Sequence, residues 1–401
     1  MGFFTKAAMN ALMNNTHPEI ERSQCWNLHP HREQCTLCKD ICPYGEDIFS
    51  RPNLVKSWDP CSDCGLCVSV CKTRCITPSE EQVQRDLSAA GADADTIWIG
   101  CERSARHNDL VRPCVGALCW EALAYLALHK KLVLDLTPCG ECENDPCAKL
   151  LRDNLTRLVE FLGQPLFEVR ITLAYQPDEA PYQAKELSRR EMFAHVGDSS
   201  KNGTKYLLRQ LPILQEEEHQ IQPFRYVLHQ RVKQLKTATQ TPFHYGVYLP
   251  AFTSKCFGCG RCVKNCRSGA IRLEDLEGGQ SRVVITPWKC SECGMCVSSC
   301  NHHAIDGLKL RPLTSLGPVS VLRFQKQLCS ECGKPIPPDS ADGVCGVCRV
   351  KIRTKKRQEA AAARAKARAA ERAAQRAAQA AQAAAEEAAP AAAPADPTPG
   401  A

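Results

Sequence analysis

The chain has 401 residues, of which 27 are Cys, and a formal net charge of +7. This length allows about two to four domains, and no run approaches the roughly 20 apolar residues that a membrane-spanning helix needs. The cysteines fall in metal-type clusters rather than in the small, disulfide-dense pattern of secreted scaffolds, so we expect a reducing, cytoplasmic compartment.

The N-terminal region, residues 1–90, predicts a first iron–sulfur module. Its first 20 or so residues have an apolar face, beginning at Phe3 and Phe4, and predict a short helix packed on a core. Further along, four cysteines have the spacing C-x2-C-x2-C-x3-C, which is typical of iron–sulfur proteins. They are Cys61, Cys64, Cys67 and Cys71.

A second, irregular cysteine loop precedes this one. Three cysteines match the last three positions of the motif, but Arg32 stands where the first is expected. These three are Cys35, Cys38 and Cys42. We expect Cys25 to supply the missing ligand by a loop that folds back. His29 and His31 are poorer candidates, and a three-iron cluster without this ligand is the alternative.

Two such loops are expected to exchange their fourth ligands, because three thiolates on a tight loop cap only one face of a [4Fe-4S] cubane. The exchange predicts one cluster held by Cys25, Cys35, Cys38 and Cys71, and another held by Cys61, Cys64, Cys67 and Cys42. Cys75 is left over, and we interpret it as a small buried hydrophobic residue.

Residues 91–175 predict a small α/β domain. Strands are expected at 96–100, 109–112, 132–136 and 166–173, and helices at 121–131 and 148–162. Strands that alternate with helices imply a parallel sheet. Four cysteines then lie at the carboxyl ends of strands, the edge where open α/β sheets place their sites. They are Cys101, Cys114, Cys139 and Cys142.

These four cysteines predict an additional metal centre or a redox dithiol, with Cys119 and Cys147 close by in sequence. A zinc site and structural free thiols are the alternatives. Cys139 and Cys142 also form a C-x-x-C pair, a spacing that can depress a thiol pKa. In spacing and strand position, this region distantly resembles the small iron–sulfur (delta) subunit that links hydrogenases to their electron acceptors. The resemblance implies a [2Fe-2S] cluster.

Residues 176–250 turn polar and predict a helical linker region, with helical pieces at 185–196 and 225–236. No glycine-rich phosphate loop or dinucleotide fingerprint occurs in the sequence. The sequence therefore predicts no flavin, nicotinamide or nucleotide site.

Residues 251–312 contain two complete cysteine motifs and predict a second module. Gly258, Gly260 and Gly294 lie between the cysteines, where the backbone must turn sharply and adopt positive φ. Exchange of fourth ligands predicts one cluster held by Cys256, Cys259, Cys262 and Cys300, and another held by Cys290, Cys293, Cys296 and Cys266. A disulfide or zinc knot is a poor alternative, because zinc needs no interlocked quartets.

The segments CFGCGRCVKNCRSGAI and CSECGMCVSSCNHHAI resemble the bacterial two-cluster ferredoxin family. The family usually follows each fourth cysteine with Pro, whereas this chain has Arg267 and Asn301. A cation beside a cluster favours the extra electron, so we expect Arg267 to raise the reduction potential of its cluster.

Residues 325–350 predict a zinc ribbon. Four cysteines have the spacing C-x2-C-x12-C-x2-C, which resembles a zinc ribbon or a rubredoxin-type knuckle pair. They are Cys329, Cys332, Cys345 and Cys348. We expect one structural Zn, with a single iron as the alternative, and no catalysis, because closed four-thiolate zinc has no open position.

The tail, residues 351–401, is rich in Ala and Arg and predicts a solvated, fraying helix followed by Pro-rich disorder. From Arg349 to Ala401, eleven Lys and Arg face five Asp and Glu, so this segment carries +6 of the net charge. A basic segment beside a zinc ribbon invites a nucleic-acid interpretation. No aromatic residues are interleaved for base stacking, which argues against nucleic acid as a partner.

The sequence thus predicts an α+β multidomain protein in which two bacterial 2[4Fe-4S] ferredoxin-like modules flank a small α/β domain with a parallel sheet. From about residue 20 to 310, the order of segments resembles multi-cluster 4Fe-4S ferredoxin proteins of anaerobes. Four [4Fe-4S] clusters predict an electron-transfer protein that serves redox partner proteins, as a carrier or as a subunit of a larger cytoplasmic oxidoreductase, and the resemblance does not identify the partner. The alternative is a redox enzyme whose middle cysteine group reduces a thiol or a small substrate.

Overall fold

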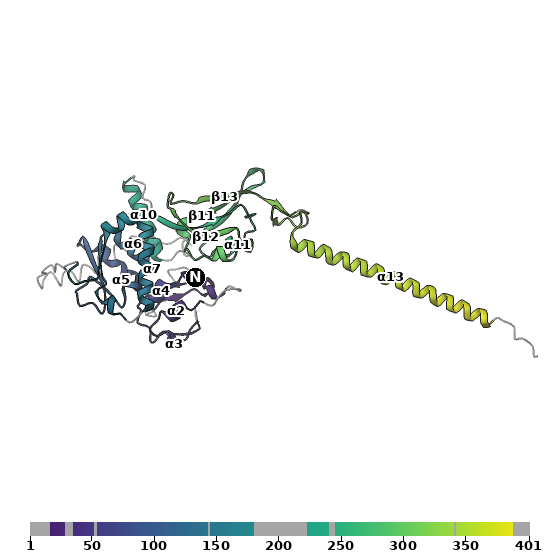
Figure 1. Cartoon of the computed structure of the whole chain (residues 1–401), viewed down its shortest axis with the longest axis horizontal. Coiled ribbons are helices and arrows are strands. Elements are labelled where there is room, and N and C mark those ends of the chain that lie inside the picture. Colours follow the sequence, from purple (N-terminus) through teal and green to yellow (C-terminus); the bar gives the residue numbers. More distant parts are fainter. Residues whose placement is uncertain are drawn as a thin grey trace, which may run out of the picture. The chain divides into compact units, whose positions relative to one another are not determined.

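The computed structural model describes residues 17–28, 35–51, 54–142, 145–179, 223–239, 245–340 and 342–387 (Figure 1). Contacts divide the chain into two compact units, Met1–Gln325 and Lys326–Ala401. Outside the described residues lie most of the predicted N-terminal helix, the helical piece at 185–196, His29, His31 and the Pro-rich end. Among the described residues, no helix is both long and apolar enough to cross a membrane.

The middle of unit 1 is a four-stranded sheet with the order β6-β5-β7-β8. Its strands are β5 (Thr96–Cys101), β6 (Leu110–Arg112), β7 (Lys131–Asp135) and β8 (Ile171–Ala174). Every neighbouring pair is parallel, so the predicted parallel sheet is confirmed. The carboxyl ends of β5, β6 and β7 therefore lie at the same edge of the sheet.

Two predicted boundaries in this domain are wrong. The strand expected at 166–173 is mostly α8 (Gln164–Arg170), because Gly163 turns the chain with a φ of 78° and Pro165 fits the first turn of a new helix. The helix expected at 121–131 is α6 (Trp120–Ala127), and Lys131 already begins β7.

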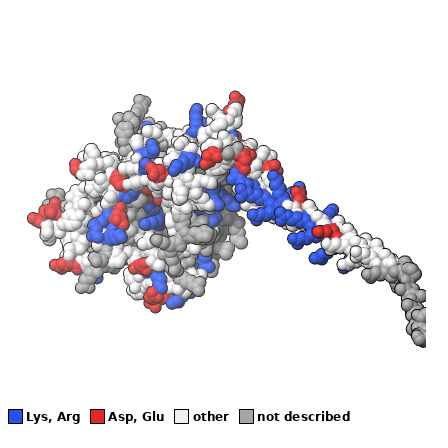
Figure 2. Space-filling view, turned by 45° about the vertical axis from the view of Figure 1, so that its right-hand side comes forward, with Lys and Arg blue, Asp and Glu red and all other residues white. Residues whose placement is uncertain are grey.

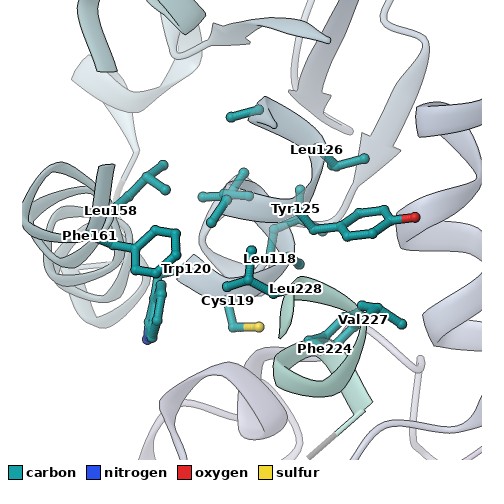
Figure 3. Close-up of a cluster of buried hydrophobic side chains, with 14 of the residues drawn as sticks. Leu118, Cys119, Trp120, Tyr125, Leu126, Leu158, Phe161, Phe224, Val227 and Leu228 are labelled. Atoms are coloured by element: carbon teal, nitrogen blue, oxygen red, sulfur yellow. The ribbon is translucent and has the colours of Figure 1, made fainter. Parts of the chain in front are cut away.

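The core of unit 1 lies where α6 packs against α7 (Asp145–Leu162) and α10 (Pro223–Thr239). Every residue of α6 is buried. Figure 3 shows Trp120 and Tyr125 on α6, Phe161 on α7 and Phe224 on α10 in this cluster. The helix predicted at 225–236 is confirmed within α10, and it contributes side chains to the core.

N-terminal to the sheet in sequence, a small module has three short helices and two short antiparallel strand pairs. β1 (Glu19–Ile20) pairs with β4 (Ile76–Thr77), and β2 (Phe49–Arg51) pairs with β3 (Leu54–Val55). α2 (Leu37–Asp40) contacts α4 (Leu66–Val70), and α3 (Gly45–Ile48) precedes β2. α5 (Glu80–Leu87) leads from this module to the sheet.

Residues 246–325 repeat this order of elements on a larger scale. β9 (Gly246–Phe252) pairs with β12 (Ile305–Pro312), and β10 (Ile271–Asp275) pairs with β11 (Gln280–Ile285). α11 (Arg261–Asn265) contacts α12 (Met295–Ser298), as α2 contacts α4. β13 (Val319–Gln325) is added to β11. Short 3-10 helices of unit 1 lie at Arg22–Gln24, Trp26–Leu28, Ser88–Gly91, Val115–Ala117, Thr137–Glu141, Glu277–Gly279 and Pro287–Lys289.

Unit 2 contains one small hairpin and one long helix. β14 (Gln327–Leu328) pairs with β15 (Pro335–Ile336), and α13 spans Gly346–Glu387. All the side chains of α13 from Lys355 to Ala385 are exposed, so the solvated helix predicted for the tail is confirmed. Figure 2 shows Lys and Arg gathered on the first part of this helix.

Candidate metal centres

Three cysteine loops share one backbone pattern. In each loop, the residues two, four and thirteen positions after the first cysteine have positive φ. These residues are Asp63, Gly65 and Arg74; Gly258, Gly260 and Gly269; and Glu292, Gly294 and His303. The positive φ predicted for Gly258, Gly260 and Gly294 is confirmed. The loop from Cys61 therefore turns in the same way as the two loops of residues 256–300.

The left-handed residue two positions after the first cysteine aims its backbone amide at that sulfur. Burial raises the pKa of Cys256, and the amide of Gly258 opposes this rise with a hydrogen bond. Burial is the main cause that raises the pKa of Cys61 to about 11, while a hydrogen bond from the amide of Asp63 acts to lower it. Amides that point at buried sulfur stabilise a thiolate, which is the form that ligates iron.

One cavity of the N-terminal module is lined by four thiols from both of its loops. They are Cys42, Cys61, Cys64 and Cys67. Burial raises the pKa of Cys67 well above its ordinary value, and the charges of Cys64, Cys42 and Cys61 raise it further. Three thiols from one loop and the fourth from the other thus face one space, the quartet that ligand exchange predicts.

A second cavity is lined by the corresponding four thiols of residues 256–300. They are Cys266, Cys290, Cys293 and Cys296. Burial raises the pKa of Cys296, and the charges of Cys290, Cys293 and Cys266 add to this effect. The donor set fits a [4Fe-4S] cluster, because four thiolates are the ligands such a cluster takes.

Electrostatic interactions between thiols place all four members of one remaining predicted quartet, and three members of the other, close together. Burial raises the pKa of Cys262 to about 12, with further contributions from Cys256, Cys259 and Cys300. Burial also raises the pKa of Cys35, and the charges of Cys71 and Cys25 contribute. The structure therefore brings Cys25 close to the loop that has no cysteine at the first position of its motif.

The third cysteines of paired loops also approach each other. The charge of Cys38 raises the buried Cys67 thiol pKa after larger contributions from burial and nearer thiols. In the second module, the charge of Cys262 likewise raises the pKa of Cys296. The two modules thus share this detail of loop pairing.

Cys75 is a fifth thiol at the site of Cys25. Its side chain is 3% exposed, and its Sγ lies 3.5 Å from Cys71 Sγ. Hydrogen bonds with Cys25 and then with Cys71 raise the pKa of Cys75. Cys75 is buried, as predicted, and it also touches two predicted ligands.

The middle cysteines gather at the carboxyl edge of the sheet. Burial, together with the charges of Cys101, Cys114 and Cys142, raises the pKa of Cys139 to about 11. A hydrogen bond from Cys147 lowers the pKa of Cys114 to about 7. Cys147, which is 4% exposed, is therefore a fifth member of this group.

Cys119 is placed differently from the middle group. It is 1% exposed and lies in the core cluster around α6 (Figure 3). Burial raises its pKa, and the charge of Glu121 adds to this rise while Arg74 opposes it. These surroundings match a structural thiol.

His17, Cys61 and Asp63 form a further group with metal-ligating atoms within 4.8 Å of one another. His17 Nδ1 lies 2.9 Å from Asp63 Oδ1, and the His17 ring stacks on Trp58. Sequence reasoning missed His17, because it lies 44 positions before Cys61 and belongs to no motif.

The four cysteines of unit 2 lie together, with all four sulfurs within 4.8 Å of one another. Cys332 Sγ lies 3.7 Å from Cys345 Sγ. Zn–S bonds of about 2.3 Å in a tetrahedron put sulfurs about 3.8 Å apart, so this set fits zinc. The amides of Cys345 and Cys348 donate to Cys329 Sγ and Cys345 Sγ, at 3.2 and 3.4 Å.

The family model of the 4Fe-4S dicluster domain matches residues 255–304. This match covers the loops from Cys256 and Cys290, so a 4Fe-4S binding domain is present in this part of the chain. The search of curated proteins found no match to the chain.

Proposed function

We propose that this chain is an electron-transfer protein that holds four [4Fe-4S] clusters, two in each of its modules. When bound, such clusters accept single electrons with little rearrangement. The observation that carries the proposal is that each module has a cavity lined by a crossed quartet of cysteines, three from one loop and one from the other.

The repeated backbone supports assigning the N-terminal module to the same class as residues 255–304. Its complete loop has positive φ at the same three positions as both loops of the matched segment. Asp63 and Arg74 adopt this conformation although left-handed backbone is unfavourable for residues with a Cβ. The same turns in all three loops indicate that the loops do the same thing, and we propose that each of them binds a cluster.

The proposed ligands of the N-terminal module are Cys25, Cys35, Cys38, Cys71, Cys42, Cys61, Cys64 and Cys67. Those of the second module are Cys256, Cys259, Cys262, Cys300, Cys266, Cys290, Cys293 and Cys296. Cys329, Cys332, Cys345 and Cys348 would hold one structural Zn, and the middle group of Cys101, Cys114, Cys139 and Cys142 would hold an additional [2Fe-2S] centre. The partners would be redox proteins in a reducing compartment, with this chain as a carrier or a subunit of an oxidoreductase.

Anaerobic purification with iron, sulfide and zinc assays, and EPR of the reduced protein, tests the proposal. We expect about 16 iron and one zinc per chain, and about 18 iron if the middle group holds two more. Iron near eight per chain would overturn the assignment of one module.

A second candidate is a redox enzyme that uses the middle cysteine group on a thiol or small substrate. The contact between Cys114 and Cys147 favours it, because a thiol with a pKa of about 7 is partly ionised at neutral pH. Replacing Cys139 and Cys142 by Ala discriminates between the two functions. Loss of one metal signal with electron transfer intact supports the carrier, whereas loss of substrate turnover alone supports the enzyme.

A further inference from the structure

The two cysteine-lined cavities differ sharply in charge. Asp63 is the one charged residue among those lining the cavity of Cys42, Cys61, Cys64 and Cys67. Four cations and no carboxylate line the cavity of Cys266, Cys290, Cys293 and Cys296. These cations are Arg74, Arg225, Arg267 and Lys289. A cluster in the second cavity would therefore experience a much more positive field.

Two of the cations come from outside residues 255–304. Arg74 belongs to the N-terminal module, three residues after Cys71, and Arg225 belongs to α10. The side chain of Arg225 is 4% exposed, and its Nε donates to the carbonyl oxygen of Trp288 at 3.1 Å. Arg225 thus lies against the backbone that leads into Cys290.

Buried carboxylates hold both arginines in place. Arg74 Nη2 donates to both carboxylate oxygens of Glu121 at 2.8 Å. Arg225 lies 3.6 Å from Glu121 and 3.4 Å from Glu292, and Arg157 donates to both oxygens of Glu292 at 2.7 and 2.9 Å. Arg157 also lies 4.0 Å from Glu160, so three arginines meet three carboxylates in this network.

None of these three carboxylates lines the cavity, whereas Arg74 and Arg225 do. A cluster with four thiolate ligands is an anion that becomes more negative when it takes up an electron, and cations that line its site stabilise the added charge.

We propose that Arg74 and Arg225 stabilise the added electron at the Cys266, Cys290, Cys293 and Cys296 site, which therefore has a higher reduction potential than the Cys42, Cys61, Cys64 and Cys67 site. The proposal rests on the proposed function. The step is uptake of one electron from a one-electron donor, in which the cluster is reduced, the donor is oxidised and no bond forms or breaks. Arg74 and Arg225 are positioning residues that act through charge.

Potentiometric titration followed by EPR tests this assignment in the full chain. Arg225→Gln should lower the equilibrium constant for reduction at one cluster at least tenfold, which is about 59 mV for one electron. Arg74→Gln should lower it in the same direction, and Arg225→Lys should restore it. The reduction step that Arg225→Gln shifts should be the one that is lost in Cys293→Ala, because Cys293 lines the second cavity.

Asp63→Asn gives the converse test, because it removes a negative charge from the other cavity and should raise the potential of a different step. Arg282→Gln is the matched control. Arg282 pairs with Glu274 at 2.7 Å and lines neither cavity. Arg282→Gln should therefore leave every reduction potential unchanged.

Iron and sulfide content separates the two levels of inference. Low iron with no reduced signal in the unmodified chain would overturn the proposed function itself. Full iron in Arg74→Gln and Arg225→Gln, with no step lowered, would overturn the role of the arginines alone. If Arg225→Gln loses iron through poor folding, Arg74→Gln still decides, because Glu121 keeps Arg225 as a neighbour.

Discussion

At the scale of single residues, five thiols meet at the incomplete N-terminal loop, although a cluster takes four. Cys25 and Cys75 are both buried, at 7% and 3% exposure. Cys75 is hydrogen-bonded to both Cys25 and Cys71. Cys25 and Cys75 are therefore competing candidates for the same ligand position. Cys25 fits the role better, because its charge acts on Cys35, a member of the same predicted quartet.

We therefore expect Cys25→Ala to lose about four iron per chain and Cys75→Ala to lose none. The two substitutions remove the same atom from equally buried sites, so each is a control for the stability cost of the other. Iron and sulfide assays after anaerobic purification give the result. Loss of iron in Cys75→Ala with full iron in Cys25→Ala would assign the ligand to Cys75 instead.

Residue-level spacing predicted the left-handed glycines and the thiols that line each cavity, because a cluster loop places its cysteines within a few positions of one another. It could not predict Arg74 and Arg225. Arg74 meets Glu121 across 47 positions of sequence, and neither residue belongs to a motif. Long-range ion pairs depend on how the elements pack, and a local pattern carries no information about that packing.

At the scale of elements, α10 shows how far packing departs from the prediction of a linker. Its sequence indicated a helix, but the buried face at Phe224 and Leu228 joins it to the core around α6 (Figure 3). The same helix carries His229, whose ring stacks on Trp288 with centroids 4.8 Å apart. α10 therefore connects the sheet domain to the backbone before Cys290.

The position of His229 predicts a loss of stability in acid. Burial, together with the charges of Lys233 and Arg225, lowers the pKa of His229 from 6.5 to about 4. The folded state then binds fewer protons than the unfolded state between about pH 4 and 6.5, so stability falls as pH falls through this window. His229→Phe keeps the stacked ring without the titrating group.

We expect the free energy of unfolding of the wild type, relative to that of His229→Phe, to fall by about 1 kcal/mol between pH 7 and 5.5. Denaturant unfolding of both proteins at the two pH values measures it. Comparison at each pH cancels effects of acid that the two proteins share. A difference that does not change with pH would contradict a neutral, buried His229.

At the scale of the whole molecule, motif order predicted the sheet domain between two cysteine-rich regions, because each region carries its own local pattern. The start of β8 was missed, since Gly163 and Pro165 begin a new helix inside an apolar run. The described residues up to Gln325 form one compact unit, and the network of Arg74, Arg157 and Arg225 links its elements.

This division predicts that a chain ending at Gln325 keeps its iron. The cut leaves all sixteen proposed cluster ligands and the whole of β13, which pairs with β11 up to Gln325. We expect unchanged iron and EPR signals and the loss of about one zinc per chain. Cys348→Ser in the full chain should likewise lose zinc alone.

A chain ending at Pro318 is the matched control, because it also removes β13. Phe324 on this strand packs so close to Gly258 that a Cβ built there would lie 2.7 Å from its ring. Without β13, β11 loses its outer partner and the Cys256 loop loses this cover, so the thermal midpoint should fall and iron should be lost on storage. Equal iron loss from both truncated chains would mean instead that unit 2 supports the clusters.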